Sequence, residues 1–191
     1  QDYFRFFFLH GKSIGFGIVV TFLSSFGQTF FLSLFVPDFM KTFSLSQAEF
    51  GTIYSALTLV SASLIPLIGG WIDHAPLKPY AMAILTAMGG GALITAGTPN
   101  IILFIIGLFL LRLTGQGLSS HTAKTTIARH FERQRGKALS IINLGFPLGE
   151  AVLPLLVTTL LGWISWRYSW GIIGGIVLLF FLPLQLYLLS T

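Results

Sequence analysis

Two ionisable side chains, Arg112 and Glu150, lie deep inside long apolar segments of the sequence. If each segment is a helix, each side chain lies about 18 Å from the start of its helix, because a helix rises about 1.5 Å per residue. A charge at that depth in a bilayer is costly unless it meets a partner or a water-filled cavity. The two segments would run in opposite directions, which places the side chains within about 6 Å of one another in depth. We therefore predict that Arg112 and Glu150 interact, directly or through water.

Further polar side chains recur at helical spacing inside the apolar segments. Gln28 shares a helical face with Thr21, Ser24 and Ser25, and Tyr54 stands one turn before Thr58. Polar atoms inside a bilayer need partners or water. We therefore predict that six residues line the path of a solute or a coupling ion: Arg112, Glu150, Gln28, Tyr54, Asn143 and Gln116.

The composition indicates that these residues belong to a membrane protein. Of the 191 residues, 54% are apolar and only 9% are charged, which is too few charges to cover a soluble domain. Apolar runs of about 20 residues have the length that spans a bilayer as a helix. Six such runs predict an all-α membrane protein with six transmembrane helices, at residues 15–36, 50–72, 80–98, 101–122, 138–161 and 168–189.

The basic residues predict the orientation of these helices. One side of the expected bundle carries Arg5, Lys12, Lys78, Lys124, Arg129, Arg133, Arg135 and Lys137, and the other carries only Lys41 and Arg167. Short loops rich in Lys and Arg stay in the cytoplasm. We therefore expect both ends of this chain in the cytoplasm, and we attribute the net charge of +5 to orientation and not to nucleic-acid binding.

The connection between the second and third apolar runs carries a motif. Gly69, Asp73 and Lys78 match the pattern G-x-x-x-D-R-x-G-R-K, whereas His74 and Leu77 stand where arginines are usual. This stretch resembles the signature of the major facilitator superfamily. In that family the aspartate helps to latch the cytoplasmic side, so the resemblance implies a cytoplasmic gate at Gly69, Asp73, His74 and Lys78, weakened by the two missing basic positions. The alternative is an ordinary solvated loop.

Other stretches carry the same resemblance. The basic loop with Arg129, Arg133, Arg135 and Lys137 is similar to the family's R-x-F-x-x-x-R-G-K-A-L, and Arg112 opens a variant of R-x-x-Q-G-x-G. Residues 145–149 look like a relative of the family's fifth-helix motif G-P-x-x-G. The resemblance extends over nearly the whole chain and includes the monocarboxylate and organic-anion branches. It implies the N-terminal six-helix half of the family's fold, built from two inverted three-helix repeats.

The resemblance also divides the chain. We expect a cytoplasmic segment at 1–14, the bundle at 15–189, and the start of a central cytoplasmic linker at 190–191. The partners implied are the lipid bilayer, a small-molecule substrate, protons, and the missing C-terminal half or a second copy of this chain. We expect the location to be a bacterial inner (plasma) membrane. Both ends of the sequence look cut, which favours a fragment of a longer chain.

The expected function is secondary active transport of a small solute by alternating access, coupled to protons, with a preference for a small organic anion. The alternative is a non-transporting receptor or scaffold built on a transporter half. Two roles stay open for each buried charge. Arg112 either binds substrate or, as in the family, bonds to kinked first-helix backbone, and Glu150 either couples protons or hydrogen-bonds a neighbouring helix as a neutral acid.

Several functions have no support in the sequence. It contains no cysteine, and its four histidines lack metal-ligand spacing, so we predict no metal site and no cofactor. A nucleophile with a neighbouring base is not apparent, and neither is the glycine-rich loop of an ATPase. We therefore expect a protein that is not an enzyme.

Overall fold

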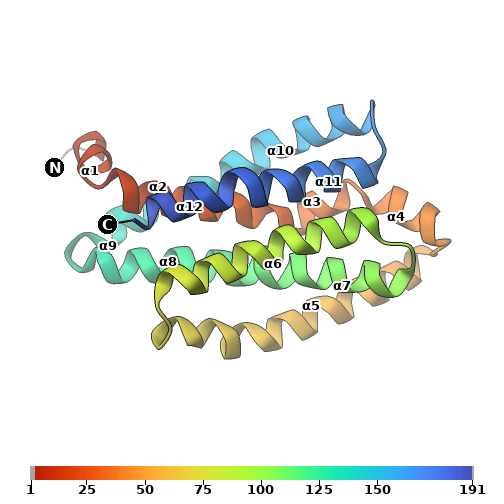
Figure 1. Cartoon of the computed structure of the whole chain (residues 1–191), viewed down its shortest axis with the longest axis horizontal. Coiled ribbons are helices and arrows are strands. Elements are labelled where there is room, and N and C mark those ends of the chain that lie inside the picture. Colours follow the sequence, from red (N-terminus) through yellow and green to blue (C-terminus); the bar gives the residue numbers. More distant parts are fainter. Residues whose placement is uncertain (1–2, 191) are drawn as a thin grey trace.

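The computed structural model describes residues 3–190, with side chains from Phe6 onward. Residues 1, 2 and 191, which belong to the expected N-terminal segment and linker, lie outside the described residues, as does the side chain of Arg5. Within residues 3–190 every regular element is a helix. The helices lie roughly along the long axis of the molecule, side by side (Figure 1).

Five helical runs are long and apolar enough to cross a membrane: Gln47–Asp73, Leu77–Gly97, Ile101–His130, Glu132–Leu161 and Trp166–Leu188. They correspond to five of the six predicted segments. The first run comprises α5 (Gln47–Gly69) and η2 (Gly70–Asp73), and the second is α6 (Leu77–Gly97). The third run consists of α7 (Ile101–Leu111), η3 (Arg112–Ser119) and α8 (Ser120–His130). The fourth consists of η4 (Glu132–Gln134), α9 (Arg135–Ile142) and α10 (Gly145–Leu161). The fifth consists of α11 (Trp166–Ile176), η5 (Val177–Phe181) and α12 (Leu182–Leu188).

The first predicted segment, 15–36, differs because it is not one helix. It follows a short helix α1 (Tyr3–Leu9) and consists of α2 (Gly11–Leu23), η1 (Ser24–Gly27), α3 (Thr29–Ser33) and α4 (Val36–Phe43). Gln28 between η1 and α3 is extended, with φ −76° and ψ 151°. The uninterrupted helix predicted there is therefore wrong. Serines and glycine, which are weak helix formers, immediately precede the break.

The basic connection predicted between the fourth and fifth apolar runs is mostly helical. Helix α8 continues to His130, and α9 begins at Arg135, so little irregular chain remains between them. Lysine, arginine and alanine are good helix formers, and nothing requires a helix to stop where the apolar run stops. The basic side chains are thus fixed on helix ends and not on a free loop.

Glycines allow the broken first segment to pack closely between its neighbours. The backbones of Gly27 and Gly115 touch, because a Cβ added at Gly115 would lie 2.6 Å from Gly27 Cα. On the other side, a Cβ added at Gly145 in α10 would lie 2.6 Å from the Ile18 carbonyl oxygen of α2. Small residues at such crossings let membrane helices approach closely. Helices α5, η3, the first segment and α10 are therefore neighbours in that order.

Helices α6 and α11 pack against each other and complete the bundle. The core contains a cluster of fully buried aromatic rings, with Phe31, Phe35 and Phe39 of the first segment against Phe104 and Trp170. The described ends of the chain lie at the same end of the bundle, together with the turns that follow η2 and α8 (Figure 1). The turns before α5, α7 and α11 lie at the opposite end (Figure 1).

Candidate functional site

Arg112 lies at the centre of the bundle and is 3% exposed. It begins the π-helical segment η3, directly opposite the break in the first segment. Its Nη1 donates to the carbonyl oxygen of Gly27 at 3.1 Å and to Thr29 Oγ1 at 3.2 Å, and its Nη2 donates to Thr58 Oγ1 at 3.0 Å. The guanidinium thus joins the broken first segment to α5.

Arg112 compensates for backbone hydrogen bonds that the helix break removes. An extended residue interrupts the helical hydrogen bonds and leaves carbonyl oxygens without partners, which is costly inside a membrane. Arg112 supplies a donor to one of these oxygens, at Gly27. This geometry corresponds to the structural role for Arg112 that the resemblance implied. Its Nε carries no protein partner, so the guanidinium is not saturated.

Tyr54 completes the surroundings of Arg112. Its hydroxyl donates to Thr29 Oγ1 at 2.9 Å, and its ring lies 4.7 Å from the guanidinium carbon of Arg112. A cation over an aromatic face is stabilised by the ring's quadrupole. Tyr54 and Thr58, predicted as one polar stripe, therefore both contact the buried charge.

The structure does not bring Glu150 into contact with Arg112. Glu150 is exposed on α10, while Arg112 bonds across to α5 and the break. The predicted direct pair is therefore wrong. The first segment lies between η3 and α10, because Gly27 packs against Gly115 and Ser25 packs against Gly149. Helical depth alone places the two charges at a similar level but says nothing about which helix separates them.

The other predicted residues lie around this centre, and none of them forms a hydrogen bond with Arg112. Gln28 is half-buried at the break, whereas Gln116 and Asn143 are exposed. Gln116 directly follows Gly115, and Glu150 directly follows Gly149. Both glycines pack against the first segment, so the two side chains lie at similar levels on either side of it. The result is a set of exposed polar groups in the apolar part of the bundle: Thr29, Gln116 and Glu150.

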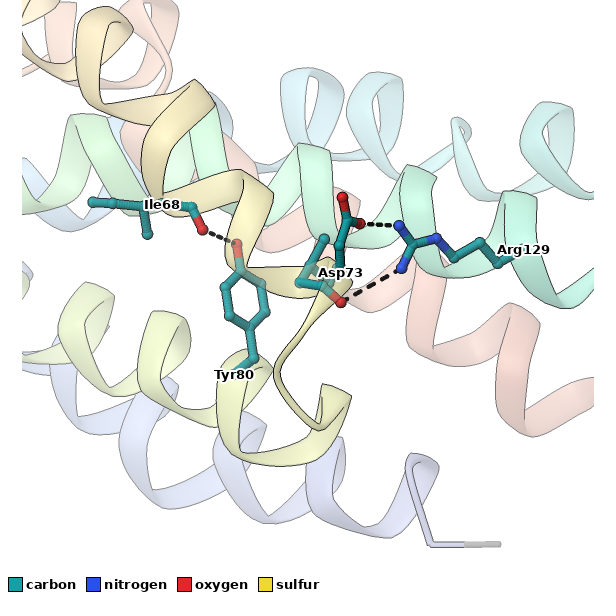
Figure 2. Close-up of polar contacts among 5 residues, drawn as sticks. Ile68, Asp73, Tyr80 and Arg129 are labelled. Atoms are coloured by element: carbon teal, nitrogen blue, oxygen red, sulfur yellow. Dashed lines mark hydrogen bonds and ion pairs between the residues drawn. The ribbon is translucent and has the colours of Figure 1, made fainter.

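At the end of the bundle that holds both described termini, Asp73 forms an ion pair with Arg129 (Figure 2). Nη1 of the same arginine donates to the Ile72 carbonyl oxygen at 3.4 Å. Arg129 therefore reaches from α8 to the C-terminal end of η2, where a cation favours both the carboxylate and the helix dipole. Among the described residues, the basic partner of Asp73 comes from α8, in the connection predicted after the fourth apolar run, and not from the motif itself.

The remaining motif residues surround this ion pair. Gly69 is buried against the ring of His121, while His74 and Lys78 are exposed. Tyr80 donates its hydroxyl to the Ile68 carbonyl oxygen at 3.2 Å and so ties the start of α6 to the end of α5 (Figure 2).

The predicted basic loop separates into residues with different surroundings. Arg129 is paired with Asp73, and Lys137 lies over the ring of Phe6 at 5.1 Å. Arg133 and Arg135 are exposed on η4 and at the start of α9. At the opposite end of the bundle, Arg167 donates to the carbonyl oxygens of Ala96 and Thr98, which end α6.

Two contact residues were not predicted to have these roles. Thr29 accepts from both Arg112 and Tyr54, and Arg129 pairs with Asp73. Thr29 could have been noticed as the polar residue beside Gln28, but only the helix break brings it to Arg112. Within the described residues, no group of three or more His, Asp or Glu side chains is arranged to hold a metal ion.

The helical fold and the buried polar centre define a polytopic membrane protein. The chain belongs to the Major Facilitator Superfamily, whose family model matches residues 17–191. This confirms the family that the motifs indicated.

Three relatives illustrate the similarity. The chain is 30% identical over 166 residues to the uncharacterized MFS-type transporter YhcA of Bacillus subtilis, an alignment covering 83% of this chain and 30% of the relative. It is 28% identical over 173 residues to a probable 4-methylmuconolactone transporter of Cupriavidus pinatubonensis, covering 83% and 38%. It is 25% identical over 151 residues to mouse monocarboxylate transporter 6, covering 77% and 31%. The chain thus spans about a third of the length of these relatives. No solved structure matches it.

Proposed function

We propose that this chain is the N-terminal six-helix bundle of a secondary transporter that moves a small organic anion by alternating access. In this proposal the broken first segment crosses the membrane once, as the five continuous runs do, and the bundle contains two inverted three-helix repeats. The positions of the turns at alternating ends of the bundle support the six crossings (Figure 1). The family of the chain and the length of its relatives support a second bundle, supplied by a C-terminal half or by a second copy.

One observation carries the proposal. Exposed polar side chains, among them Thr29, Gln116 and Glu150, stand at the level of the buried Arg112, in the part of the bundle where lipid would surround an isolated helix. Lipid offers no hydrogen bonds, so such groups need water, substrate or another protein surface. A water-filled cavity between two bundles supplies all three. A scaffold or receptor surface would satisfy the same groups, so the choice of transport rests on the family of the chain.

The substrate class follows from charge. Arg112 is the one basic residue in the buried centre of the described bundle, and its Nη1 donates to the exposed Thr29. Guanidinium groups favour carboxylates because of matching planar geometry. The names of two relatives, a monocarboxylate transporter and a 4-methylmuconolactone transporter, agree with small organic anions.

Proton coupling is assigned to Glu150 in this proposal. It is the one carboxylate among the predicted cavity residues, it lies at the level of the helix break, and it is exposed where the second bundle would face it. A carboxyl group in a cavity that opens alternately to two sides changes its surroundings with each opening, and therefore changes its proton affinity. The basic end of the bundle faces the cytoplasm of a bacterial plasma membrane.

The test is uptake by the full-length transporter that carries this chain, reconstituted in proteoliposomes. A panel of labelled organic acids, sugars and cationic drugs is first ranked by thermal stabilisation, because a ligand that binds the folded state raises its apparent stability. We expect saturable uptake of a monocarboxylate driven by an inward proton gradient. Binding without uptake would favour the receptor, and uptake of sugars or cations alone would contradict the substrate class.

A further inference from the structure

A groove at the basic end of the bundle lies outside the buried centre. It has a volume of about 450 Å³ and runs between α8 and the segment formed by α9 and the link that follows it. Its polar lining consists of Lys124, Thr125, Arg129, Arg135 and Asn143. No carboxylate lines it.

The three basic residues of this groove are not equally available to a ligand. Arg129 is engaged by Asp73, as described above. Lys124 and Arg135 are exposed, and within the described part of the chain neither forms an ion pair. Both therefore keep their full charge for a ligand, beside the Thr125 hydroxyl and the Asn143 amide, which can donate hydrogen bonds. An arginine fork with a lysine and neutral donors suits a carboxylate or sulfonate.

Polar side chains lie between the groove and the polar surface around Arg112. On the helical run Ile101–His130, Gln116, Ser120 and Lys124 follow Arg112 at intervals of four residues, and all three are at least partly exposed. The Lys124 ammonium lies 5.0 Å over the ring of Phe146 on α10. Phe146 stands between Asn143, which lines the groove, and Glu150. A polar path thus leads from the groove to the level of the helix break.

We propose that this groove is a second, peripheral binding site that holds the organic anion at the inner mouth of the transport path, with Lys124 and Arg135 as its cationic contacts. The proposal rests on the proposed function, because it names a waiting site for the same substrate. A cleft lined by one sign of charge raises the local concentration of an oppositely charged solute. We assign a soluble anion to the site because polar side chains line the groove on both sides, Thr125 on α8 and Asn143 at the end of α9. A lipid headgroup is the competing occupant.

The experiment measures binding of trifluoroacetate by ¹⁹F NMR to the full-length transporter in nanodiscs of neutral lipid. The site variant is the double substitution Lys124→Gln and Arg135→Gln. The matched control, Arg133→Gln with Lys41→Gln, removes the same charge from exposed positions outside the groove. A third variant, Lys124→Arg with Arg135→Lys, keeps both charges and guards against misfolding of the first.

We expect the site variant to bind the probe about tenfold more weakly, while the control stays within about twofold of the unmodified protein. The charge-retaining variant should bind within about threefold. Equal loss in the site variant and the control would overturn the proposal, because net charge alone would then explain binding. Absence of probe binding in the unmodified protein would also overturn it.

Two further measurements separate the competing explanations. If phosphatidylglycerol in the nanodisc displaces the probe and the site variant abolishes this competition, the groove is a lipid site and the proposal fails. Uptake assays on the same variants distinguish this failure from failure of the transport function. A waiting site predicts a raised KM, with kcat retained, for anion presented from the basic end only.

Discussion

Several contacts together hold the Arg112 side chain in place. Three oxygens from two segments accept its hydrogen bonds, and the ring of Tyr54 covers it. Hydrogen bonds to charged groups contribute more than neutral ones, and a buried carbonyl left without a donor costs about 1–3 kcal/mol. The side chain therefore supports the break in the first segment, whatever it also does to a substrate.

Substitution of Arg112 by lysine tests this support. Lysine keeps the charge but loses the planar fork that reaches Gly27 and Thr58 together. We expect a loss of about 2 kcal/mol in the free energy of unfolding, visible as a lower Tm. The matched control, Arg133→Lys, changes an exposed side chain and should leave Tm unchanged. An unchanged Tm for Arg112→Lys, combined with a raised KM for the substrate, would instead assign the residue to substrate binding alone.

Replacement of Glu150 by glutamine tests proton coupling. The side chain is exposed on α10, so the isosteric change should leave Tm within about 2 °C of the unmodified protein. We expect uptake that no longer responds to an inward proton gradient, because glutamine cannot bind and release the proton. The measurement compares uptake with and without the gradient. The control is Glu49→Gln, in the first turn of α5 and away from the level of Glu150, where glutamine can keep the capping box. Full proton dependence in Glu150→Gln would remove this residue from the coupling mechanism.

At the scale of elements, the broken first segment packs between two neighbouring helical runs. It packs through Gly27 against η3 and through α2 against α10, with backbone contacts on both sides. Membrane helices gain little from burying apolar surface, so close packing and hydrogen bonding hold them together. A single methyl group at these contacts should therefore separate helices.

Substitution of Gly27 by alanine is the direct test. Its Cβ would overlap the Leu111 carbonyl oxygen and lie 2.7 Å from the Gln116 backbone nitrogen, and neither atom can move without moving η3. We expect a loss of about 2–3 kcal/mol in stability, in the range of overpacked cores. Gly90→Ala, whose Cβ would meet nothing within 4 Å, is the control and should be neutral or slightly stabilising. Equal melting temperatures for the two variants would show that the close contact is not maintained in the membrane.

At the scale of the whole molecule, charge and topology agree. The start of α6, which carries Lys78, and the turn between α8 and α9, flanked by Arg129 and Arg135, lie at the end of the bundle that also holds both described termini (Figure 1). The start of α11, which carries Arg167, lies at the other end (Figure 1). This distribution predicts that the basic end faces the cytoplasm.

Cysteine labelling tests the orientation, because these 191 residues contain no cysteine. Gly136→Cys places a thiol at the basic end, where a Cβ meets no neighbour, and Ser165→Cys places one at the opposite end. With any other cysteines of the full-length protein removed, a membrane-impermeant thiol reagent added to intact cells should label Ser165→Cys only. Permeabilised cells, in which both react, provide the control. Labelling of Gly136→Cys alone would reverse the predicted orientation.

Much of this protein is determined by local properties of its sequence. Apolar runs long enough to span a bilayer, basic residues at one side, and the spacing of Gly69, Asp73 and Lys78 were sufficient to predict five of the spans and the family. These features depend on hydropathy and chain order, which require no knowledge of neighbours. Arg112 was recognised for the same reason, since a charge inside an apolar run is visible in the sequence.

Tertiary structure decided what these residues contact. Depth along a helix suggested a pair between Arg112 and Glu150, but the first segment lies between their helices, and Arg112 bonds to its broken backbone. Likewise Asp73 takes its partner from α8. Such outcomes depend on which faces meet when glycines let backbones touch, and on which backbone oxygens a break leaves without partners. The pairing of helix faces and the position of unpartnered backbone oxygens both depend on several segments at once. The sequence pattern of one segment therefore could not predict them.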